Sequence, residues 1–134
     1  MKTKYILTAV LAVMLTACGG KTSSENEQPG NAILEIPERV DMGEFEGPYY
    51  KKFVNIEFKN VGTDTLYIFS VLPECDCTEL EVVDSIVAPQ KSGIIKAYLD
   101  LSGYSSLETE KSFIVSSNNK KARRVYVTLV GRIK

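Results

Sequence analysis

The sequence predicts an all-β domain, an immunoglobulin-like antiparallel β-sandwich of about seven strands. Three observations carry this prediction. Apolar and polar residues alternate with a period of two in several stretches, which is typical of half-buried strands. Turn-forming residues separate these stretches at short intervals. No long segment shows the 3.6-residue period of a helix.

The first predicted strands are short and are separated by polar turns. Residues 32–36 form an apolar run that a proline ends, and residues 41–48 read as a turn-rich edge piece. Residues 53–58 alternate between apolar and polar side chains, which predicts a half-buried strand. A turn at residues 60–64 leads into residues 66–71, a run of β-branched and aromatic residues typical of a strand.

The second half of the chain repeats this alternation. Residues 80–82 read as a short strand, and residues 88–93 read as a turn. A loop at residues 102–106 and a hairpin tip at residues 118–121 separate the last three strands. These strands are expected to turn the following side chains toward the core: Ile95, Ala97, Leu99, Phe113, Val115, Val125, Val127, Leu129 and Ile133.

Residues 1–17 are predicted to be a lipoprotein signal peptide. Lys2 and Lys4 precede an apolar run that is too short to span a bilayer as a helix. Small residues then precede Cys18, a pattern that resembles the lipobox of bacterial lipoproteins. The resemblance implies cleavage before Cys18 and its acylation, for example with palmitate. The alternative is an ordinary signal peptide followed by an incidental cysteine.

The expected location follows from this anchor. Each buried CH₂ of an acyl chain contributes about 0.8 kcal/mol, so several chains hold a protein durably in a membrane of the cell envelope. We expect the outer membrane, with the domain in the periplasm or on the cell surface. Residues 18–31 are interpreted as the lipidated cysteine and a flexible linker, because residues 19–31 contain no aliphatic or aromatic side chain. The sandwich is then expected to occupy residues 32–134.

Composition excludes several classes of function. The chain has 134 residues, a formal net charge of −1 and no histidine. The absence of histidine rules out Ser-His-Asp and Cys-His catalysis and any zinc site that needs an imidazole. The nearly balanced charge argues against a nucleic-acid partner. With no glycine-rich phosphate loop and no spaced carboxylate pair, we expect a protein that is not an enzyme and has no cofactor.

A series of short motifs runs from Asp41 to Ile133. In chain order these are Met42-Gly43, Asn60-Val61-Gly62, Leu66-Tyr67-Ile68, Cys75-Asp76-Cys77-Thr78, Pro89-Gln90-Lys91-Ser92-Gly93, Ser117-Asn118 and Gly131. Their order resembles a bacterial immunoglobulin-like domain family of unassigned function, domain-of-unknown-function family 1573. The resemblance implies the sandwich fold and no established reaction. Asp76 and Gln90 stand where the family pattern has glycine, and aspartate enters the left-handed region at modest cost.

The cysteine pair leaves three interpretations open. Residues i and i+2 of a strand have Cα atoms about 6.6 Å apart, near the upper limit for a disulfide, so a bond between Cys75 and Cys77 requires a bend. Pro73 and Asp76 are suited to supply it. The pair is a local staple or two packed thiols, a labile redox pair, or a soft-metal site that holds Cu(I) between two thiolates.

Charged and aromatic residues suggest further candidate surfaces. Four cations cluster near one hairpin, where they are either a solvated tip or a contact for an anionic envelope polymer or lipid headgroup: Lys120, Lys121, Arg123 and Arg124. Glu74, Asp76 and Glu79 have no known calcium-loop spacing. The tyrosines are most simply sheet residues, of which an exposed subset could form a binding face.

The sequence therefore predicts a lipid-anchored envelope protein with a binding or scaffolding module. Its expected partners are the membrane, through the lipid anchor, and an envelope protein or glycan. The alternative function is a thiol-redox or copper-handling domain that acts through Cys75 and Cys77.

Overall fold

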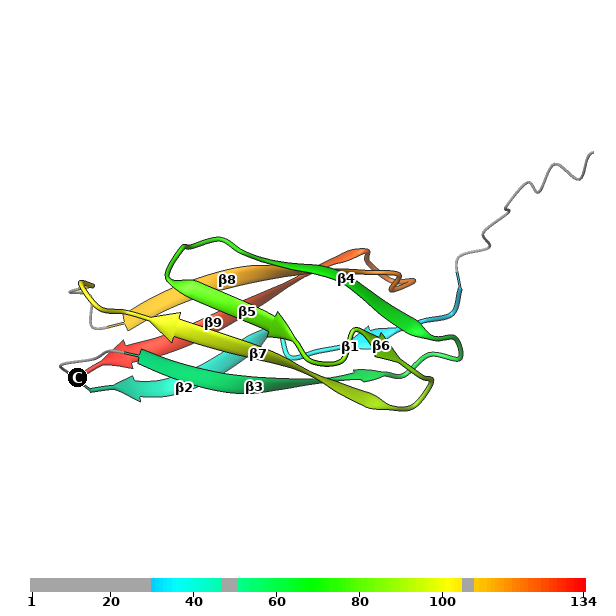
Figure 1. Ribbon diagram of the computed structural model, residues 1–134, viewed down its shortest axis with the longest axis horizontal. Helices are drawn as coiled ribbons and strands as arrows, with labels where there is room; N and C mark the ends of the chain where they lie inside the picture. Colours follow the sequence, from blue (N-terminus) through cyan, green and yellow to red (C-terminus); the bar gives the residue numbers. More distant parts are fainter. Residues whose placement is uncertain (1–29, 47–50, 105–107) are drawn as a thin grey trace, which may run out of the picture.

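The computed structural model describes residues 30–46, 51–104 and 108–134 of the chain. These residues form two β-sheets packed face to face, which confirms the all-β sandwich (Figure 1). No helix able to cross a membrane occurs in these three ranges. The predicted signal peptide, Cys18 and most of the predicted linker lie outside the described residues.

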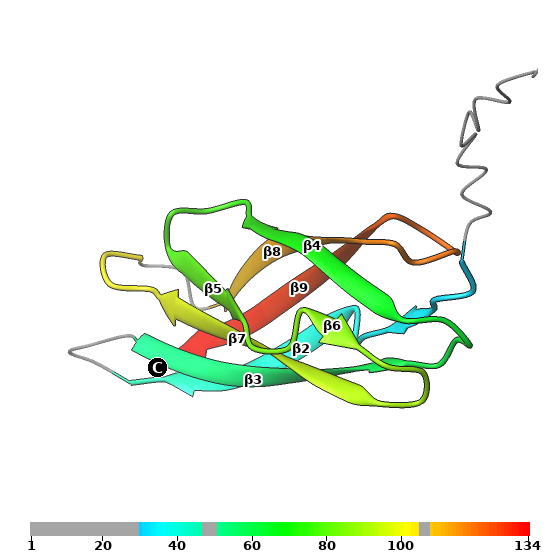
Figure 2. The same cartoon turned by 45° about the vertical axis from the view of Figure 1, so that its right-hand side comes forward.

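One sheet has four strands in the order β1-β3-β7-β5, and the other has five in the order β2-β9-β8-β4-β6. Figures 1 and 2 show the two layers and their twist. The strands are β1 (Leu34–Glu35), β2 (Arg39–Phe45), β3 (Lys51–Asn60), β4 (Leu66–Pro73), β5 (Thr78–Val82), β6 (Ile86–Val87), β7 (Ser92–Asp100), β8 (Glu108–Ser117) and β9 (Arg124–Ile133).

Two details differ from the sequence prediction. The described residues hold nine strands rather than about seven, and β2 pairs with β9 in parallel, so the sheets are not wholly antiparallel. The region expected to be a turn-rich edge piece contains β2, whose register shifts between Asp41 and Glu44 around Gly43 at a φ of 75°. This bulge breaks the period of two. The unpredicted strand β6 has two residues, too few to show any period.

The core lies between the sheets and comes from both of them. Every side chain that the alternation placed inward on β7, β8 and β9 is buried or packs against the core. The core residues all fall between Ala32 and Leu129, so a chain that begins at residue 19 keeps all of them. They are Ala32, Leu34, Met42, Phe45, Ile56, Phe58, Leu66, Ile68, Val87, Ile95, Ala97, Leu99, Leu101, Phe113, Val115, Val127 and Leu129.

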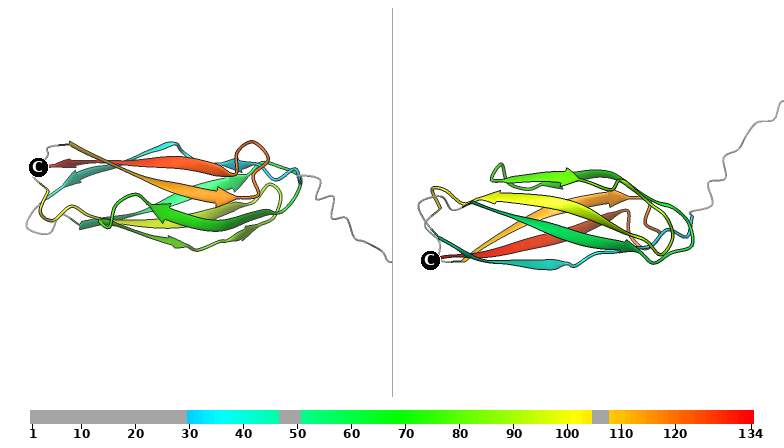
Figure 3. Two further views of the ribbon diagram at one scale, coloured as in Figure 1. Left: turned by 90° about the horizontal axis from the view of Figure 1, so that it is seen from above. Right: turned by 60° about the horizontal axis from the view of Figure 1, so that its bottom comes forward.

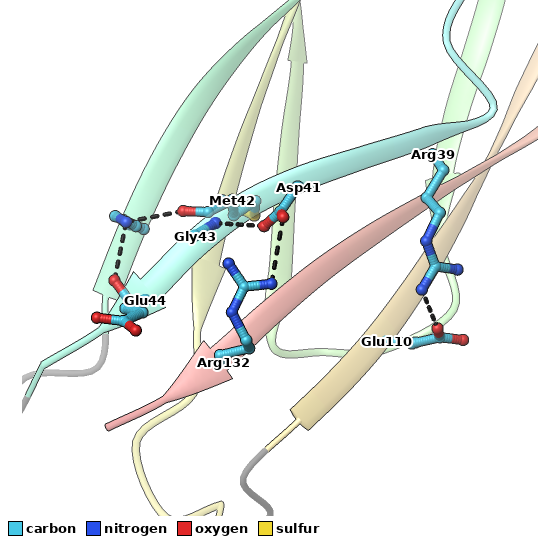
Figure 4. A network of polar contacts seen from close by, with 8 residues as sticks. Arg39, Asp41, Met42, Gly43, Glu44, Glu110 and Arg132 are labelled. Atoms are coloured by element: carbon cyan, nitrogen blue, oxygen red, sulfur yellow. Dashed lines mark hydrogen bonds and ion pairs between the residues drawn. The ribbon is translucent and has the colours of Figure 1, made fainter.

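The two edges of the five-stranded sheet are blunted against further strands. The Lys52 ammonium donates to the β2 carbonyl oxygens of Met42 at 2.7 Å and Glu44 at 2.8 Å (Figure 4). A register shift between Ile68 and Ser70, and the proline that ends β4, interrupt the edge beyond β6. Bulges, prolines and edge lysines all disfavour strand addition. On this sheet the outer face is therefore the larger surface open to a partner.

The described chain begins and ends at opposite ends of the sandwich (Figures 1 and 3). Backbone hydrogen bonds of 2.9 Å join Thr63 N–H to the Asn31 carbonyl and Lys120 N–H to the Ala32 carbonyl. We call this end, which carries residues 30–32, 61–64 and 118–121, the tether end. The opposite end, which we call the far end, carries the β4–β5 loop and Lys134.

Candidate functional site

Cys75 and Cys77 lie in the β4–β5 loop at the far end and are joined by a disulfide, with a Cα–Cα distance of 5.1 Å. Both residues are half-buried, and Cys77 packs against the core. The Asp100 N–H donates to the Cys77 carbonyl at 2.8 Å, which fixes this loop against the end of β7. The pair is therefore both partly accessible and structurally embedded.

Polar groups surround the sulfur of Cys75. The Cys77 N–H donates to Cys75 Sγ at 3.1 Å, and the Tyr104 hydroxyl lies 3.4 Å from the same atom. The Lys111 ammonium lies 4.4 Å from the centre of the Tyr104 ring. Cys75 Sγ therefore accepts one backbone hydrogen bond and has a phenol hydroxyl beside it.

The acidic side chains near this loop do not form a metal centre. Glu74, Asp76 and Glu79 are exposed. Within residues 30–46, 51–104 and 108–134, no three or more cysteine, aspartate or glutamate side chains gather closely enough to hold a metal ion.

The candidate basic residues lie in and beside the β8–β9 hairpin at the tether end. Lys120, Lys121, Arg123 and Arg124 are all exposed. No carboxylate of the described residues comes within ion-pair distance of these four cations. Lys120 Nζ donates to Asn31 Oδ1 at 2.6 Å. The hairpin therefore presents concentrated positive charge.

The outer face of the five-stranded sheet is apolar across its middle. Leu72, Ile114 and Tyr126 lie in one row, because Leu72 pairs with Ile114 and Ile114 pairs with Tyr126. Phe113 and Val127, which flank the row in sequence, are buried, so the row points outward. Leu72 and Tyr126 are each 57% exposed. We call these three residues the apolar row.

The apolar row continues toward the tether end. Phe69 is 66% exposed at the β4 bulge, and Tyr67 pairs with Ile86 across β4 and β6. Five of the eight large exposed apolar side chains of the described residues thus lie on this one face. Beside the row, Arg39, Arg124 and Tyr126 line part of a shallow hollow of about 590 Å³.

Sequence reasoning did not identify this face. The available signal was the sequence of β4, because most residues of the run Leu66–Leu72 are apolar at both the even and the odd positions. An antiparallel strand with one solvated face normally alternates, so a run without alternation indicates a second apolar face. Of the tyrosines in the described residues, Tyr67, Tyr104 and Tyr126 are exposed, and of these three Tyr67 and Tyr126 contribute to the face.

The family motifs around asparagine are structural. Asn60 is fully buried, and its side-chain amide donates to the carbonyls of Asp64 at 2.8 Å and Val87 at 3.0 Å. Its Oδ1 accepts the Gly62 N–H at 3.0 Å and the Ile33 N–H at 3.4 Å. Asn60 thus connects β1, the β3–β4 turn and β6.

Two further asparagines, Asn118 and Asn119, hold the same end together. Asn118 Oδ1 accepts the Tyr67 N–H at 2.8 Å, and its amide donates to the Thr65 carbonyl at 3.0 Å. Asn119 Oδ1 accepts the Leu34 N–H at 3.2 Å. These contacts rigidify the tether end and hold the basic hairpin beside β1 and β4.

The titratable groups with shifted pKa values lie at the surface. A hydrogen bond from Gly43 N–H, together with the Arg132 guanidinium, lowers the pKa of Asp41 (Figure 4). Hydrogen bonds from Ser102 lower the pKa of Asp100, and Asp100 in turn raises the pKa of Lys51. These groups stabilise turns and strand edges.

Residues 36–133 match the family model described as a protein of unknown function, DUF1573. The chain belongs to this family. The match spans β2 to β9, including the disulfide loop and the apolar row. Gln90 stands where the sequence resemblance expected glycine, and it adopts a φ of 65°, whereas Asp76 is not among the residues with positive φ.

Solved structures similar to this DUF1573 chain share its fold. A Porphyromonas gingivalis W83 protein of unknown function aligns with a TM-score of 0.69 and 17% identity, over 78% of this chain and 48% of that one. The secreted serine protease VesC from Vibrio cholerae aligns with a TM-score of 0.55 and 16% identity, over 80% and 24%. The periplasmic chaperone SfaE aligns with a TM-score of 0.53 and 14% identity, over 75% and 57%. No curated protein matches the sequence.

At these identities the similarity concerns the fold alone. The chain spans about half of the Porphyromonas protein and about a quarter of VesC. A human CEP192 PapD-like domain also aligns, at a TM-score of 0.52 and 12% identity, over 79% of this chain and 87% of that one. The described sandwich is therefore of the immunoglobulin-like and PapD-like kind.

Proposed function

We propose that this protein is a lipid-anchored component of the cell envelope whose sandwich binds another envelope protein and catalyses no reaction. The apolar row carries this proposal. Monomeric proteins rarely leave large contiguous apolar patches in water, and patches with a polar border mark interaction sites. Here Ser70 pairs with Ser116, and Ser116 pairs with Arg124. These three polar residues form the next row of the sheet and so border the apolar row on one side.

The chemistry of the face favours a protein over a glycan. Leucine and isoleucine side chains offer no hydrogen-bond donor or acceptor, so within the apolar row only the Tyr126 hydroxyl could pair with the hydroxyl groups of a sugar. They bury well against an apolar protein surface, and aromatic residues are enriched in protein interfaces.

Site-specific photocrosslinking in intact cells tests the binding face. A benzophenone amino acid is placed at Leu72 or Tyr126, and the control carries it at the exposed Asn55 on the outer face of the other sheet. We expect a discrete protein adduct from the first two positions and none from Asn55. The same adducts from all three positions, or from none, would contradict binding through this face.

The anchor is tested separately. Cells are fed a clickable palmitate analogue, and the wild-type protein is compared with Cys18→Ser. We expect label and outer-membrane fractionation in the wild type, and loss of both in the variant. A variant that keeps the label would refute acylation at Cys18.

A second candidate function is thiol–disulfide exchange at Cys75 and Cys77. The Cys77 N–H that donates to Cys75 Sγ supports it, because such a bond would stabilise the thiolate released when an external thiolate attacks the disulfide at Cys77. The products would be a mixed disulfide and then, after a second external thiol reacts, an oxidised external dithiol and the reduced pair. Acid trapping and alkylation in cells would detect a steady fraction of reduced Cys75 and Cys77, which a fixed staple would not show.

Copper handling is tested on the same protein. Native mass spectrometry of the reduced protein with added Cu(I) would show one bound copper ion if the two thiolates form a site. Double substitution of Cys75 and Cys77 by serine would abolish that binding.

A further inference from the structure

We propose that the tether end of the sandwich rests directly on an anionic lipid surface. The contacting surface consists of Lys120, Lys121, Arg123, Arg124, Tyr67, Phe69 and Ile86, and we call it the basic–aromatic surface. This inference rests on the proposed lipid anchoring and adds the orientation of the domain on the membrane.

The charge of this surface is concentrated and unneutralised. No aspartate or glutamate occurs from Lys111 to Lys134, so the hairpin carries no carboxylate of its own. Glu35 lines a hollow with Lys121, and Glu38 lines another with Arg124, yet neither carboxylate is within ion-pair distance of a hairpin cation. By contrast, Lys51, Arg132 and Lys134, which lie toward the far end, are each within ion-pair distance of a carboxylate. Clustered cations of this kind are attracted to anionic lipid headgroups.

Apolar side chains lie next to these cations. Asn118 joins the hairpin to β4, because its N–H donates to the Tyr67 carbonyl at 3.2 Å and its Oδ1 accepts the Tyr67 N–H. Tyr67 and its cross-strand partner Ile86 point outward together, and Ile86 is 65% exposed. A surface that combines exposed aromatic and aliphatic side chains with lysine and arginine suits the boundary between headgroups and acyl chains.

The chain that precedes the domain enters at this same end. Asn31 N–H donates to the Asp64 carboxylate, and the Asn31 side chain accepts from Lys120 Nζ. Figure 3 shows the described chain starting at the end opposite to the C-terminus. Eleven residues, 19–29, separate Cys18 from Gly30. Even fully extended, a chain of that length reaches at most about 40 Å, so an acylated Cys18 would keep the tether end within that distance of the bilayer.

This placement has a consequence for the rest of the molecule. With the tether end on the lipid, the far end with the Cys75–Cys77 loop and Tyr104 points away from the membrane. The apolar row stands beside the membrane surface rather than on it, so it remains open to a protein in the same compartment.

Vesicle sedimentation of residues 19–134 tests the proposal without the acyl group. The probes are vesicles of 30% phosphatidylglycerol in phosphatidylcholine and vesicles of phosphatidylcholine alone. We expect binding to the anionic vesicles that weakens at least tenfold between 50 and 300 mM NaCl, because surface charges are screened. The variant with Lys120, Lys121, Arg123 and Arg124 replaced by glutamine is expected to bind at least tenfold more weakly.

A matched control removes the same charge elsewhere. It replaces Lys51, Lys96, Arg132 and Lys134 by glutamine, four cations that each lie within ion-pair distance of a carboxylate. This control is expected to bind within threefold of wild type, and Phe69→Ser is expected to weaken binding severalfold. Thermal unfolding of each variant shows that it is folded.

Equal loss of binding in the two glutamine variants would mean attraction by net charge alone and would overturn the proposal. Absence of binding to the anionic vesicles would also overturn it. A dimer in sedimentation velocity that the glutamine variant abolishes, without any vesicle binding, would also overturn the proposal. The partner of this surface would then be a second copy of the chain rather than lipid. A protein that fails these tests but incorporates palmitate at Cys18 would refute the docking and leave the anchor intact.

Discussion

The ring of Phe45 on β2 packs directly over Gly131 on β9. A Cβ atom added at Gly131 would come within 2.6 Å of Phe45 Cε2, and Phe45 is only 2% exposed. The closing glycine of the family motif therefore makes room for a large core side chain.

We expect Gly131→Ala to destabilise the domain by about 1–3 kcal/mol, because the added methyl group overpacks a dense core. The free energy of unfolding in urea measures the effect. Phe45→Leu removes ring atoms, so the double variant should be more stable than the sum of the single changes predicts. Strict additivity would mean that the two residues do not compete for space.

Asn60→Ala should destabilise the domain by about 3 kcal/mol, since it leaves buried backbone groups of Gly62, Asp64 and Val87 without their side-chain partner. Urea denaturation compares it with Asn55→Ala, an exposed asparagine on the same strand, which should lie within about 0.5 kcal/mol of wild type. Similar losses in the two variants would argue against a special role for the buried amide.

Substitutions at Gln90 separate backbone strain from hydrogen bonding. Gln90 has a φ of 65°, and its side-chain amide donates to the Gly62 carbonyl at 3.1 Å. Gln90→Ala keeps the unfavourable φ and loses the bond, which should cost about 1 kcal/mol. Gln90→Gly loses the bond but removes the penalty of the left-handed conformation, so it should be less destabilising than Gln90→Ala. Thermal unfolding of both variants tests this order, and a lower unfolding temperature for Gln90→Gly than for Gln90→Ala would contradict it.

The disulfide should contribute little to global stability. Cys75 and Cys77 are two positions apart, so the bond closes a very small loop. The loss of chain entropy on closing such a loop corresponds to about 1.5 kcal/mol or less. We expect the double serine variant to unfold cooperatively with a midpoint only slightly below wild type. Failure of that variant to fold would show that the loop depends on the bond.

The shifted carboxyl groups predict the response to acid. The pKa of Asp41 and of Asp100 is lower in the folded protein than in the unfolded chain. A lowered folded pKa gives stability that is present above the unfolded pKa, about 4, and is lost as the pH falls through the folded pKa. We expect the thermal unfolding temperature to fall when the pH is lowered below about 4. Asp41→Asn or Asp100→Asn should make this fall slightly smaller. Both groups are exposed, so each effect is small.

How much the sequence predicts depends on the length and regularity of each element. The inward residues of β7, β8 and β9, such as Ile95, Phe113 and Val127, follow the period of two and are buried. The sequence could not reveal the parallel pairing of β2 with β9, because strand partners far apart in the chain leave no local pattern. The sequence singled out Cys75 with Cys77, and Lys120 with its neighbours, as chemically distinctive, but not where these groups lie relative to each other.

The sequence alone determined the sandwich class, the alternation that fills its core, and the family motifs. Local periodicity and turn chemistry carry that information because they act between residues close in the chain. Only the tertiary structure decided that Leu72, Ile114 and Tyr126 form one row and that the cysteine loop lies opposite the basic hairpin. Such relationships arise from the register of strands that are distant in sequence, and packing of the whole core selects that register.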